Sequence, residues 1–290
     1  MKILILGANG MIGHQMWRKL DQAFPGQVWG SVRNEATFYK KFGIFKSERL
    51  IPHLDVTDFV KTQRVLDEHK PDVILNCIGI TLRKPEIKNS ELCLEVNSMF
   101  PHRLSFWVKK NKTRLIHFST DCVFDGSDGL YDEDSDPTAK DVYGKTKFLG
   151  EVSGQGCLTL RTPILGREIE GKTELVEWFL AQKNKKIKGF ANAIYSGITS
   201  PEIAKQVIQI IKNYPNLEGL YQISSQPISK YDLLVMLNEI AAVDATIERD
   251  ETYATNKSLD SKKYRQLTGY QPPSWHYMLT EMMGEKYDSN

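Results

Sequence analysis

The sequence predicts an α/β fold, with a doubly wound parallel sheet followed by a smaller mixed α/β C-terminal region. Short apolar runs alternate with amphipathic stretches through the first half of the chain. Several of these runs, such as Val73-Ile74-Leu75, are continuously apolar, which is typical of strands buried on both faces of a parallel sheet. A glycine-rich turn also follows the first run, at the point where a strand would enter a helix.

Six strands and four helices are expected in the first half, in alternation. The strands are expected at residues 2–6, 27–31, 51–54, 72–77, 114–119 and 157–161, and the helices at 10–23, 57–69, 90–111 and 139–154. Strands that alternate with helical segments form βαβ units and therefore a parallel sheet. We expect residues 1–161 to form one domain on this sheet.

The second half has a looser rhythm. Helices are expected at residues 172–182, 201–213, 230–241 and 275–283, with one short strand at 219–223 and a polar loop at 190–197. Pro201 suits the first turn of its helix, where its missing N–H costs nothing. Residues 162–290 are therefore expected to form a smaller region that caps the carboxyl edge of the sheet and is interleaved with the first domain.

Composition narrows the class of protein. The 290 residues carry a net charge of +2, with 41% hydrophobic and 26% charged residues, as in a globular protein with a substantial core. No stretch is basic enough to indicate nucleic acid, and no apolar run reaches the roughly 18 residues of a membrane helix. The four cysteines form no CxxC pair, which predicts reduced thiols, no metal site and a cytoplasmic location. A homodimer is a further possibility, because any exposed helix face could form the contact between two copies of the chain.

The glycine turn predicts a Rossmann dinucleotide site. Gly7 permits a tight strand-to-helix turn, Gly10 lets the backbone approach a pyrophosphate, and Gly13 lets the helix pack on the sheet. The helix N-terminus then offers free N–H groups to the phosphates. The cofactor contacts predicted here are Gly7, Asn9, Gly10, Met11, Ile12 and Gly13.

The end of the second strand favours NADPH, with NADH as the alternative. An NAD site usually has an acid there for the ribose hydroxyl, whereas this chain has Ser31 and Arg33, which suit a 2′-phosphate. Asp55 and Val56 follow the third strand, where they would meet the adenine. The segment after the fourth strand is expected to reach the ribose side of the cofactor, through Cys77, Ile78 and Gly79.

A tyrosine and a lysine predict the proton donor. Tyr143 and Lys147 are spaced i and i+4, so they share one face of a helix. A phenol has a pKa of about 10, and a nearby ammonium group is expected to lower it and to let the phenol protonate a carbonyl. Lys147 and Tyr143 are also expected to touch the cofactor. Thr120, after the fifth strand, would orient the substrate carbonyl. Asn97 is also a predicted cofactor contact and would hold backbone or a water that relays protons through Lys147.

These motifs together resemble the extended short-chain dehydrogenase/reductases. Two longer strings are similar to the dTDP-4-dehydrorhamnose reductase family, Ser119-Thr-Asp-Cys-Val-Phe-Asp-Gly126 and Tyr143-Gly-Lys-Thr-Lys-Phe-Leu-Gly-Glu151, and so is the tail at Ser258–Lys263 and Gln271–Trp275. The resemblance implies reduction of a nucleotide-linked 4-keto-6-deoxy sugar, a precursor of surface polysaccharide. It also implies Thr120, Tyr143 and Lys147 as the catalytic set.

Two departures from that family bear on the substrate. Cys122 stands where the family typically has tyrosine, and the run Asn76-Cys-Ile-Gly-Ile-Thr81 replaces the usual small residues. Both features resemble the branch that reduces UDP-linked 4-keto-6-deoxy-N-acetylhexosamines, so that substrate is favoured over dTDP-4-dehydrorhamnose. The predicted substrate contacts are Arg83, Lys84, Asp121, Cys122, Thr162, Asn192, Tyr195 and Ser196.

Three other activities are weighed against the reductase. The related 4,6-dehydratases carry Asp-Glu after the threonine, and Cys122 is a poor substitute for that glutamate base. An epimerase of this fold would hold NAD permanently, which the missing acid after the second strand disfavours. A non-catalytic NADP-binding regulatory protein commonly lacks the tyrosine or the lysine, and this chain has both.

Overall fold

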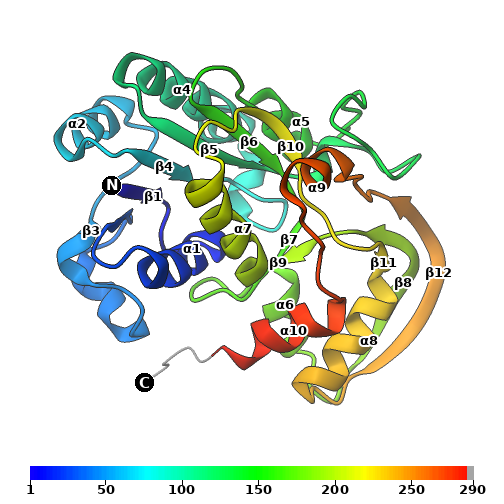
Figure 1. Ribbon diagram of the computed structural model, residues 1–290. Helices are drawn as coiled ribbons and strands as arrows, with labels where there is room; N and C mark the ends of the chain where they lie inside the picture. The colour runs from blue at the N-terminus through cyan, green and yellow to red at the C-terminus, as the bar shows by residue number, and fades with distance from the viewer. Residues whose placement is uncertain (286–290) are drawn as a thin grey trace.

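The computed structural model describes residues 1–285 and has a seven-stranded parallel sheet at its centre (Figure 1). The strand order is β10-β6-β5-β4-β1-β2-β3, and every neighbouring pair is parallel. The strands are β1 (Ile3–Leu6), β2 (Val28–Ser31), β3 (Leu50–Ile51), β4 (Val73–Asn76), β5 (Arg114–Ser119), β6 (Cys157–Arg161) and β10 (Gly219–Gln222). The predicted doubly wound α/β fold is therefore confirmed, and the strand order reverses between β1 and β4, where such folds bind ligands.

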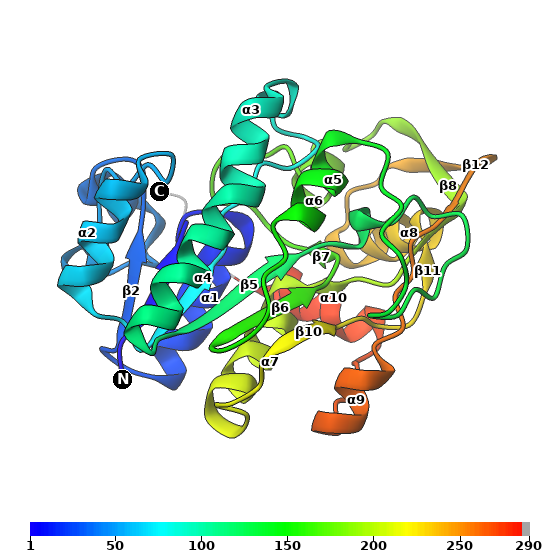
Figure 2. The same cartoon turned by 90° about the horizontal axis from the view of Figure 1, so that it is seen from above.

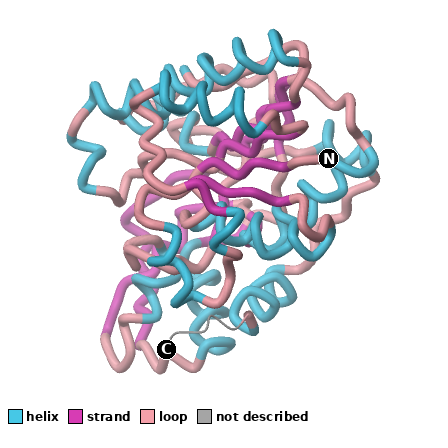
Figure 3. Tube along the Cα trace, turned by 90° about the vertical axis from the view of Figure 1, so that its left-hand side faces the viewer, coloured by secondary structure: helices cyan, strands magenta, loops and turns pink. Residues whose placement is uncertain are grey.

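Helices cover both faces of this sheet, because successive side chains of a strand point to opposite faces (Figures 2 and 3). In β1, Ile3 and Ile5 pack in one cluster with helices α1 (Met11–Ala23) and α7 (Ser200–Asn213). Leu4 and Leu6 pack in a second cluster with α2 (Phe59–His69) and α4 (Phe100–Asn111). The continuous apolar strands are thus explained by two separate hydrophobic layers.

The helix expected at residues 90–111 is not regular. It runs as α3 (Ser90–Cys93), a π-helical turn η4 (Leu94–Met99) and then α4. Single π-helical turns often occur at functional sites, and this one contains Asn97. Short 3₁₀ helices lie at η1 (Ala36–Phe42), η2 (Ser47–Arg49), η3 (Pro85–Lys88) and η5 (Asp121–Val123).

The second half forms a three-stranded sheet of order β11-β8-β12 beside the main sheet (Figure 1). Its strands are β8 (Lys186–Tyr195), β11 (Ile228–Ser229) and β12 (Thr246–Asn256), and helix α8 (Lys230–Ala241) packs on β8. A two-stranded pair joins β7 (Ile164–Leu165) to β9 (Ile198–Thr199). The remaining helices are α5 (Val142–Leu149), α6 (Leu175–Leu180), α9 (Lys262–Thr268) and α10 (Trp275–Gly284).

The loop expected at residues 190–197 is wrong, because most of it belongs to β8. The buried face of that strand is made of Gly189, Ala191, Ala193 and Tyr195, while Phe190 on the opposite face is exposed. Small residues inside and a large apolar residue outside hide the alternation that identifies a strand. Strand β12 was also missed, because most of its residues are exposed and polar. Within residues 1–285, no helix is both long and apolar enough to cross a bilayer.

Several predicted boundaries need correction. The strand expected at 51–54 is only Leu50–Ile51, and the helices expected at 172–182 and 139–154 are shorter, at α6 and α5. Strand β10 pairs with β6 in the main sheet, and α7 covers that sheet beside α1. The chain thus returns to the first sheet after residue 161.

Candidate active site

The glycine turn joins β1 to α1 and depends on two missing side chains. Gly7 has a φ of +78°, which disfavours any residue with a Cβ, and a Cβ on Gly13 would lie 2.0 Å from the carbonyl oxygen of Gly7. Gly10 is the N-cap of α1, so Asn9, Met11 and Ile12 surround the N-terminus of that helix. The turn therefore presents backbone N–H groups in the arrangement that binds phosphate.

Three predicted cofactor contacts have other roles in the structure. Ser31 is buried, and its Oγ accepts a hydrogen bond from the Gly7 N–H at 3.2 Å. This hydrogen bond stabilises the glycine turn. Val56 is buried in the core under α2. Asn97 binds the backbone of Ile80 through its Oδ1 and Nδ2, at 2.8 and 3.0 Å, and clamps the segment after β4.

Arg33 remains exposed at the end of β2. Its positive charge lies near Asp55, whose pKa is lowered first by the backbone N–H of Thr57 and to a smaller degree by Arg33. The carboxylate of Asp55 also accepts a hydrogen bond from the Thr57 hydroxyl at 2.8 Å, which fixes it on the rim of the site. An exposed guanidinium at this position fits a 2′-phosphate.

Helix α5 and the turn η5 pack directly against each other, and this packing positions the predicted proton donor. A Cβ on Gly144 would lie 2.0 Å from the carbonyl oxygen of Cys122, so only glycine allows the contact. Asp141 caps α5 by accepting a hydrogen bond from the Gly144 N–H at 2.9 Å. As a result, Tyr143 lies beside Thr120 and Cys122 at the carboxyl end of β5.

The electrostatics of Tyr143 differ from the sequence prediction. Burial raises the pKa of the phenol well above its usual value, and the neighbouring Cys122 adds to this effect. A hydrogen bond from Thr120 acts in the opposite direction, and Lys147 is not among the groups that lower the pKa of the phenol. The phenol is therefore fully protonated at neutral pH, which suits a proton donor.

Lys147 lies behind the site, against β5. Its Nζ donates to the carbonyl oxygen of Phe118 at 2.6 Å and lies 3.4 Å from Nε2 of His117. Burial lowers the pKa of the ammonium group to about 8, although Glu151 opposes the shift. Lys147 is thus able to release a proton near neutral pH, which a solvent-exposed lysine does not do.

The substrate side of the site gathers four side chains. Burial raises the pKa of Cys122 to about 12, so its thiol is neither a nucleophile nor a base at neutral pH. Asp121 is buried and accepts a hydrogen bond from the Thr120 hydroxyl at 3.1 Å. Tyr195, at the end of β8, lies close enough to Asp121 and Cys122 for their charges to raise its pKa, after burial. The Nζ of Lys230 lies 3.7 Å from the centroid of the Tyr195 ring.

Lys230 was not predicted as a site residue. It begins α8, and burial lowers its pKa to about 8 although Asp121 favours its charge. A cation in the first turn of a helix is opposed by the helix dipole, so a lysine there needs another reason for its position. A lysine in the first turn of a predicted helix was the sequence feature that could have identified Lys230. Its proximity to Asp121 arises only in the folded chain.

A glutamate-rich segment, residues 168–174, crosses from the glycine turn to the residues after β4. Asn9 donates to Glu170 at 2.8 Å, and Lys84 contacts both Glu168 and Thr173 at 3.1 Å. Arg83 lies 4.0 Å from Glu174. The two basic residues expected to meet the substrate diphosphate are therefore paired with this segment in the structure.

Of three other predicted substrate contacts, two are buried and one is exposed on β8. Ser196 is buried, and its Oγ accepts a hydrogen bond from the Leu259 N–H at 2.9 Å. Thr162 is buried too, without a hydrogen-bond partner for its hydroxyl among residues 1–285. Asn192 is exposed on β8 and donates to the carbonyl oxygen of Glu251. Burial and the strand register of β8 explain these departures from the predicted loop.

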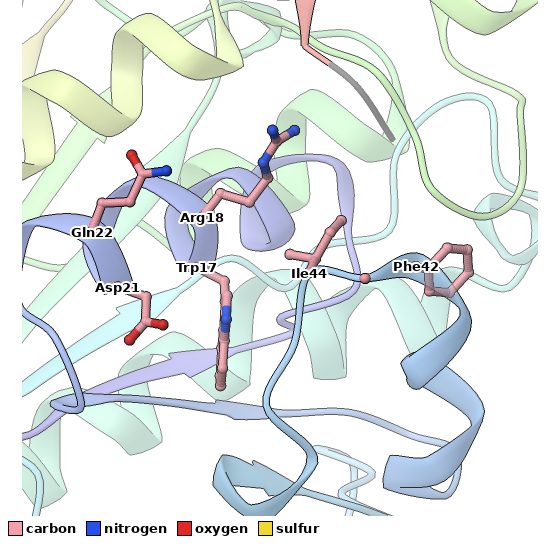
Figure 4. A pocket seen from close by; sticks show the side chains of 7 residues that line it. Trp17, Arg18, Asp21, Gln22, Phe42 and Ile44 are labelled. Carbon is pink, nitrogen blue, oxygen red and sulfur yellow. The ribbon is translucent and has the colours of Figure 1, made fainter. Parts of the chain in front are cut away.

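A separate pocket lies on the outer side of α1 and contains none of the predicted site residues. Its lining, most of which is labelled in Figure 4, comes from α1, from the end of η1 and from the two residues that follow: Trp17, Arg18, Asp21, Gln22, Phe42, Gly43 and Ile44. In the described part of the chain, no group of three or more histidine, cysteine or acidic side chains is arranged to hold a metal ion. The four cysteines are free thiols.

Known proteins resemble this chain over different lengths. A probable low-salt glycan biosynthesis reductase, Agl14 of Haloferax volcanii, is 31% identical over 52% of this chain and 48% of its own length, so the match spans about half of that relative. Methionine adenosyltransferase 2 subunit beta of Xenopus tropicalis is 26% identical over 80% of this chain and 70% of its own. The dTDP-4-dehydrorhamnose reductase of Bacillus anthracis, solved in complex with NADP, has a TM-score of 0.78 at 22% identity and covers 97% of this chain and 98% of its own.

The family model covers almost the whole chain. The model described as RmlD substrate binding domain matches residues 1–287. That match includes the glycine turn, the Thr120 and Tyr143 segments and the C-terminal region, so it confirms the resemblance drawn from the motifs. The chain belongs to the RmlD substrate-binding domain family.

Proposed function

We propose that this chain is an NADPH-dependent reductase of a nucleotide-linked 4-keto-6-deoxy sugar and acts in the cytoplasm, on a precursor of surface polysaccharide. A UDP-linked N-acetylhexosamine is favoured as the substrate, and dTDP-4-dehydrorhamnose is the second candidate. One observation carries the proposal: the close packing of α5 on η5, which brings the phenol of Tyr143 to Thr120 at the sheet edge that also carries the glycine turn.

The residues around the turn fit a bound NADPH. Gly7 and Gly13 allow the tight turn into α1, and Gly10 would let the backbone at the N-terminus of that helix approach the pyrophosphate. Arg33 is exposed and would reach a 2′-phosphate. The solved reductase of Bacillus anthracis is in complex with NADP, which supports the same cofactor here. When bound, the cofactor would supply a hydride to the carbonyl carbon of the substrate.

The chain itself would supply the proton. Tyr143 is protonated at neutral pH because burial raises its pKa, and it would donate that proton to the carbonyl oxygen. Thr120 would hold the carbonyl oxygen and the phenol in line. A phenolate left in this buried position is costly, so its proton must be replaced at once. Lys147, one helical turn away and with a pKa lowered to about 8, is the group proposed to do this.

The substrate side supports a nucleotide-linked sugar. Although burial raises the pKa of Asp121, the positive charges of Lys230 and Lys257 favour its carboxylate form. The same two charges would attract a diphosphate to the site. Cys122 is smaller than the tyrosine common at this position and would leave more space beside the sugar ring. That space favours a ring that carries an acetamido group, as in the UDP-linked N-acetylhexosamines.

The proposal is tested with purified protein, NADPH and the keto product of a UDP-GlcNAc 4,6-dehydratase. We expect loss of the reduced nicotinamide absorbance, faster with the UDP sugar than with dTDP-4-dehydrorhamnose. Tyr143→Phe should abolish turnover without changing NADPH binding, whereas Tyr253→Phe, at an exposed position on β12, should behave as the native chain does. Absence of oxidation with both keto sugars would refute the proposal.

A regulatory role is the second candidate, because the relatives include methionine adenosyltransferase 2 subunit beta over 80% of this chain. A subunit of that kind would bind NADPH but oxidise it with neither sugar. Retention of both Tyr143 and Lys147 favours the enzyme. An epimerase would instead be purified with nicotinamide already bound, and the absorbance of the purified protein decides this point.

A further inference from the structure

A row of three polar side chains lies buried behind the active site, across β4, β5 and α5. Asn76 ends β4 and His117 lies directly opposite it in β5, so both side chains point to the same face of the sheet. Asn76 Nδ2 lies 3.1 Å from Nδ1 of His117, and His117 Nε2 lies 3.4 Å from Nζ of Lys147. All three residues are at least 95% buried. Buried polar groups in such a row need matched donors and acceptors.

The hydrogen bonds of Asn76 fix which nitrogen of His117 carries a hydrogen. Asn76 Oδ1 accepts from the Ile78 N–H at 3.3 Å, so its amide nitrogen is the atom that faces the ring. Nδ1 of His117 must then accept a hydrogen bond from Asn76. A neutral imidazole that accepts at Nδ1 has its hydrogen on Nε2, which points at Lys147.

This arrangement favours one protonation state of Lys147. An ammonium group has only donors, so a ring N–H that points at it makes no hydrogen bond, whereas a neutral amine accepts one. The amine can still donate to the carbonyl oxygen of Phe118, 2.6 Å away. After it has lost a proton, Lys147 therefore has an acceptor in Phe118 and a donor in His117.

The other charged and titratable groups around the row do not change this conclusion. Glu151, two residues after the end of α5, favours the ammonium form of Lys147, but it is bound to Arg161 at 2.7 and 2.8 Å and to Ser119 at 2.6 Å. Burial is the main cause that lowers the pKa of His117, and the positive charges of Lys147 and of His102 on α4 lower it further. The ring of His117 therefore stays uncharged.

We propose that Asn76 and His117 are positioning residues of the reduction, which hold Lys147 against β5 and stabilise it once it has passed its proton to Tyr143. The proposal rests on the proposed reductase function. In the reaction, the O–H bond of Tyr143 breaks as the carbonyl oxygen takes the proton and the carbonyl carbon takes the hydride. An N–H bond of Lys147 then breaks to restore the phenol, one helical turn away, and a proton from water later restores the ammonium group.

The hydrogen position can be measured without any activity. Nitrogen NMR of the full chain, labelled at histidine, distinguishes the two neutral tautomers and the charged ring, and loss of one signal in His117→Asn assigns the residue. We expect a neutral ring with its hydrogen on Nε2 between about pH 6 and pH 9, across the range in which an ordinary histidine titrates. A hydrogen on Nδ1, or a charged ring, would overturn the proposal even if the chain proves to be a reductase.

Two substitutions should affect turnover in different ways. Asp at position 76 would accept a hydrogen from Nδ1 of His117, which turns Nε2 into an acceptor for the ammonium form. Asn76→Asp should therefore move the alkaline fall of kcat upward by about one pH unit, a tenfold change in the proton affinity of Lys147. His117→Asn should lower kcat about tenfold with KM changed less than about twofold, because a proton-transfer step loses its support.

The control is His276→Asn, an exposed histidine on α10, which should leave kcat and its pH profile unchanged. If Asn76 and His117 have a purely structural role, Asn76→Asp and His117→Asn should lose equal fractions of kcat with no shift of the pH profile. That result would contradict the proposal. If Asn76→Asp fails to fold, the tautomer in the native chain still decides.

Discussion

Tyr143 and Lys147 are one helical turn apart, and burial acts on the two side chains in opposite directions. It raises the pKa of the phenol and lowers that of the ammonium group to about 8. In both cases the uncharged form is favoured, as desolvation requires. The pair is therefore a protonated phenol beside a lysine that readily gives up a proton, rather than a phenolate held by a fixed positive charge.

The pH dependence of kcat should report Lys147. Because its pKa is lowered to about 8, Lys147 is charged below that pH and loses its proton as the pH rises through it. Reduction consumes a proton, so we expect kcat to fall above about pH 8. Steady-state rates at saturating substrate test this expectation, and a kcat that is constant to about pH 10 would contradict it.

Lys230 has a pKa near the same value, so its titration must be separated from that of Lys147. Lys230 faces the substrate side, and its loss of charge should raise KM rather than lower kcat. Lys230→Gln should therefore raise KM across the whole pH range and leave the alkaline fall of kcat in place. If that fall disappears in Lys230→Gln, Lys147 is not its source.

Arg33 should determine the preference for NADPH over NADH. Arg33→Gln removes the guanidinium that suits a 2′-phosphate, and we expect KM for NADPH to rise about tenfold with little change for NADH. This corresponds to about 1.4 kcal/mol of binding free energy. Steady-state kinetics with both cofactors measure the ratio. Equal losses for both cofactors would show that Arg33 supports the fold of the rim instead.

At the scale of elements, the helix that carries Tyr143 depends on a glycine. Gly144→Val would push a side chain into the carbonyl oxygen of Cys122, where even a Cβ comes within 2.0 Å of backbone. We expect kcat to fall at least tenfold and stability to fall by about 1–3 kcal/mol, because α5 must move away from η5. Kinetics and urea unfolding measure the two effects.

The matched control is Gly284→Ala at the end of α10, since a Cβ there meets no atom of residues 1–285 within 4 Å. It should change neither activity nor stability by a measurable amount. If Gly144→Val retains full activity, the packing of α5 on η5 does not position Tyr143.

Elements buried on both faces were the ones that the sequence identified best. Strands such as β4 are uniformly apolar, and the turn at Gly7 follows directly from its residues. Strand β8 was missed because Gly189 and Ala191 face inward while Phe190 faces solvent. Small residues are needed on the inward face of β8 because α8 packs closely against it. The local sequence of β8 does not show that this helix lies there.

For the whole molecule, the parallel sheet explains why distant segments form one site. The carboxyl ends of β1, β4 and β5 meet at one edge. Gly7, Gly79 and Thr120 were expected together because each follows a strand of one parallel sheet. Lys230 and His117 were not identified, because the first comes from an element outside that sheet and the second acts through a buried neighbour. Contacts between separate layers are fixed by tertiary packing, which a single sequence does not show.

The interleaving of the two regions has a consequence for stability. Strand β10 and helix α7 belong to the second half of the chain but complete the first sheet and its hydrophobic layer. A fragment that ends at residue 161 would expose the edge of β6 and the apolar side of α1, so it should not fold independently.

The transfer of hydride to the sugar is the central step of this account, and isotope labelling tests it most directly. The chain is incubated with the UDP-linked 4-keto-6-deoxy sugar and NADPH that carries deuterium at the transferable position, and the sugar product is analysed by NMR. We predict deuterium on carbon 4 of the product with the native chain and none with Tyr143→Phe. Deuterium that stays on the cofactor while the native chain is folded and NADPH is bound would contradict the account.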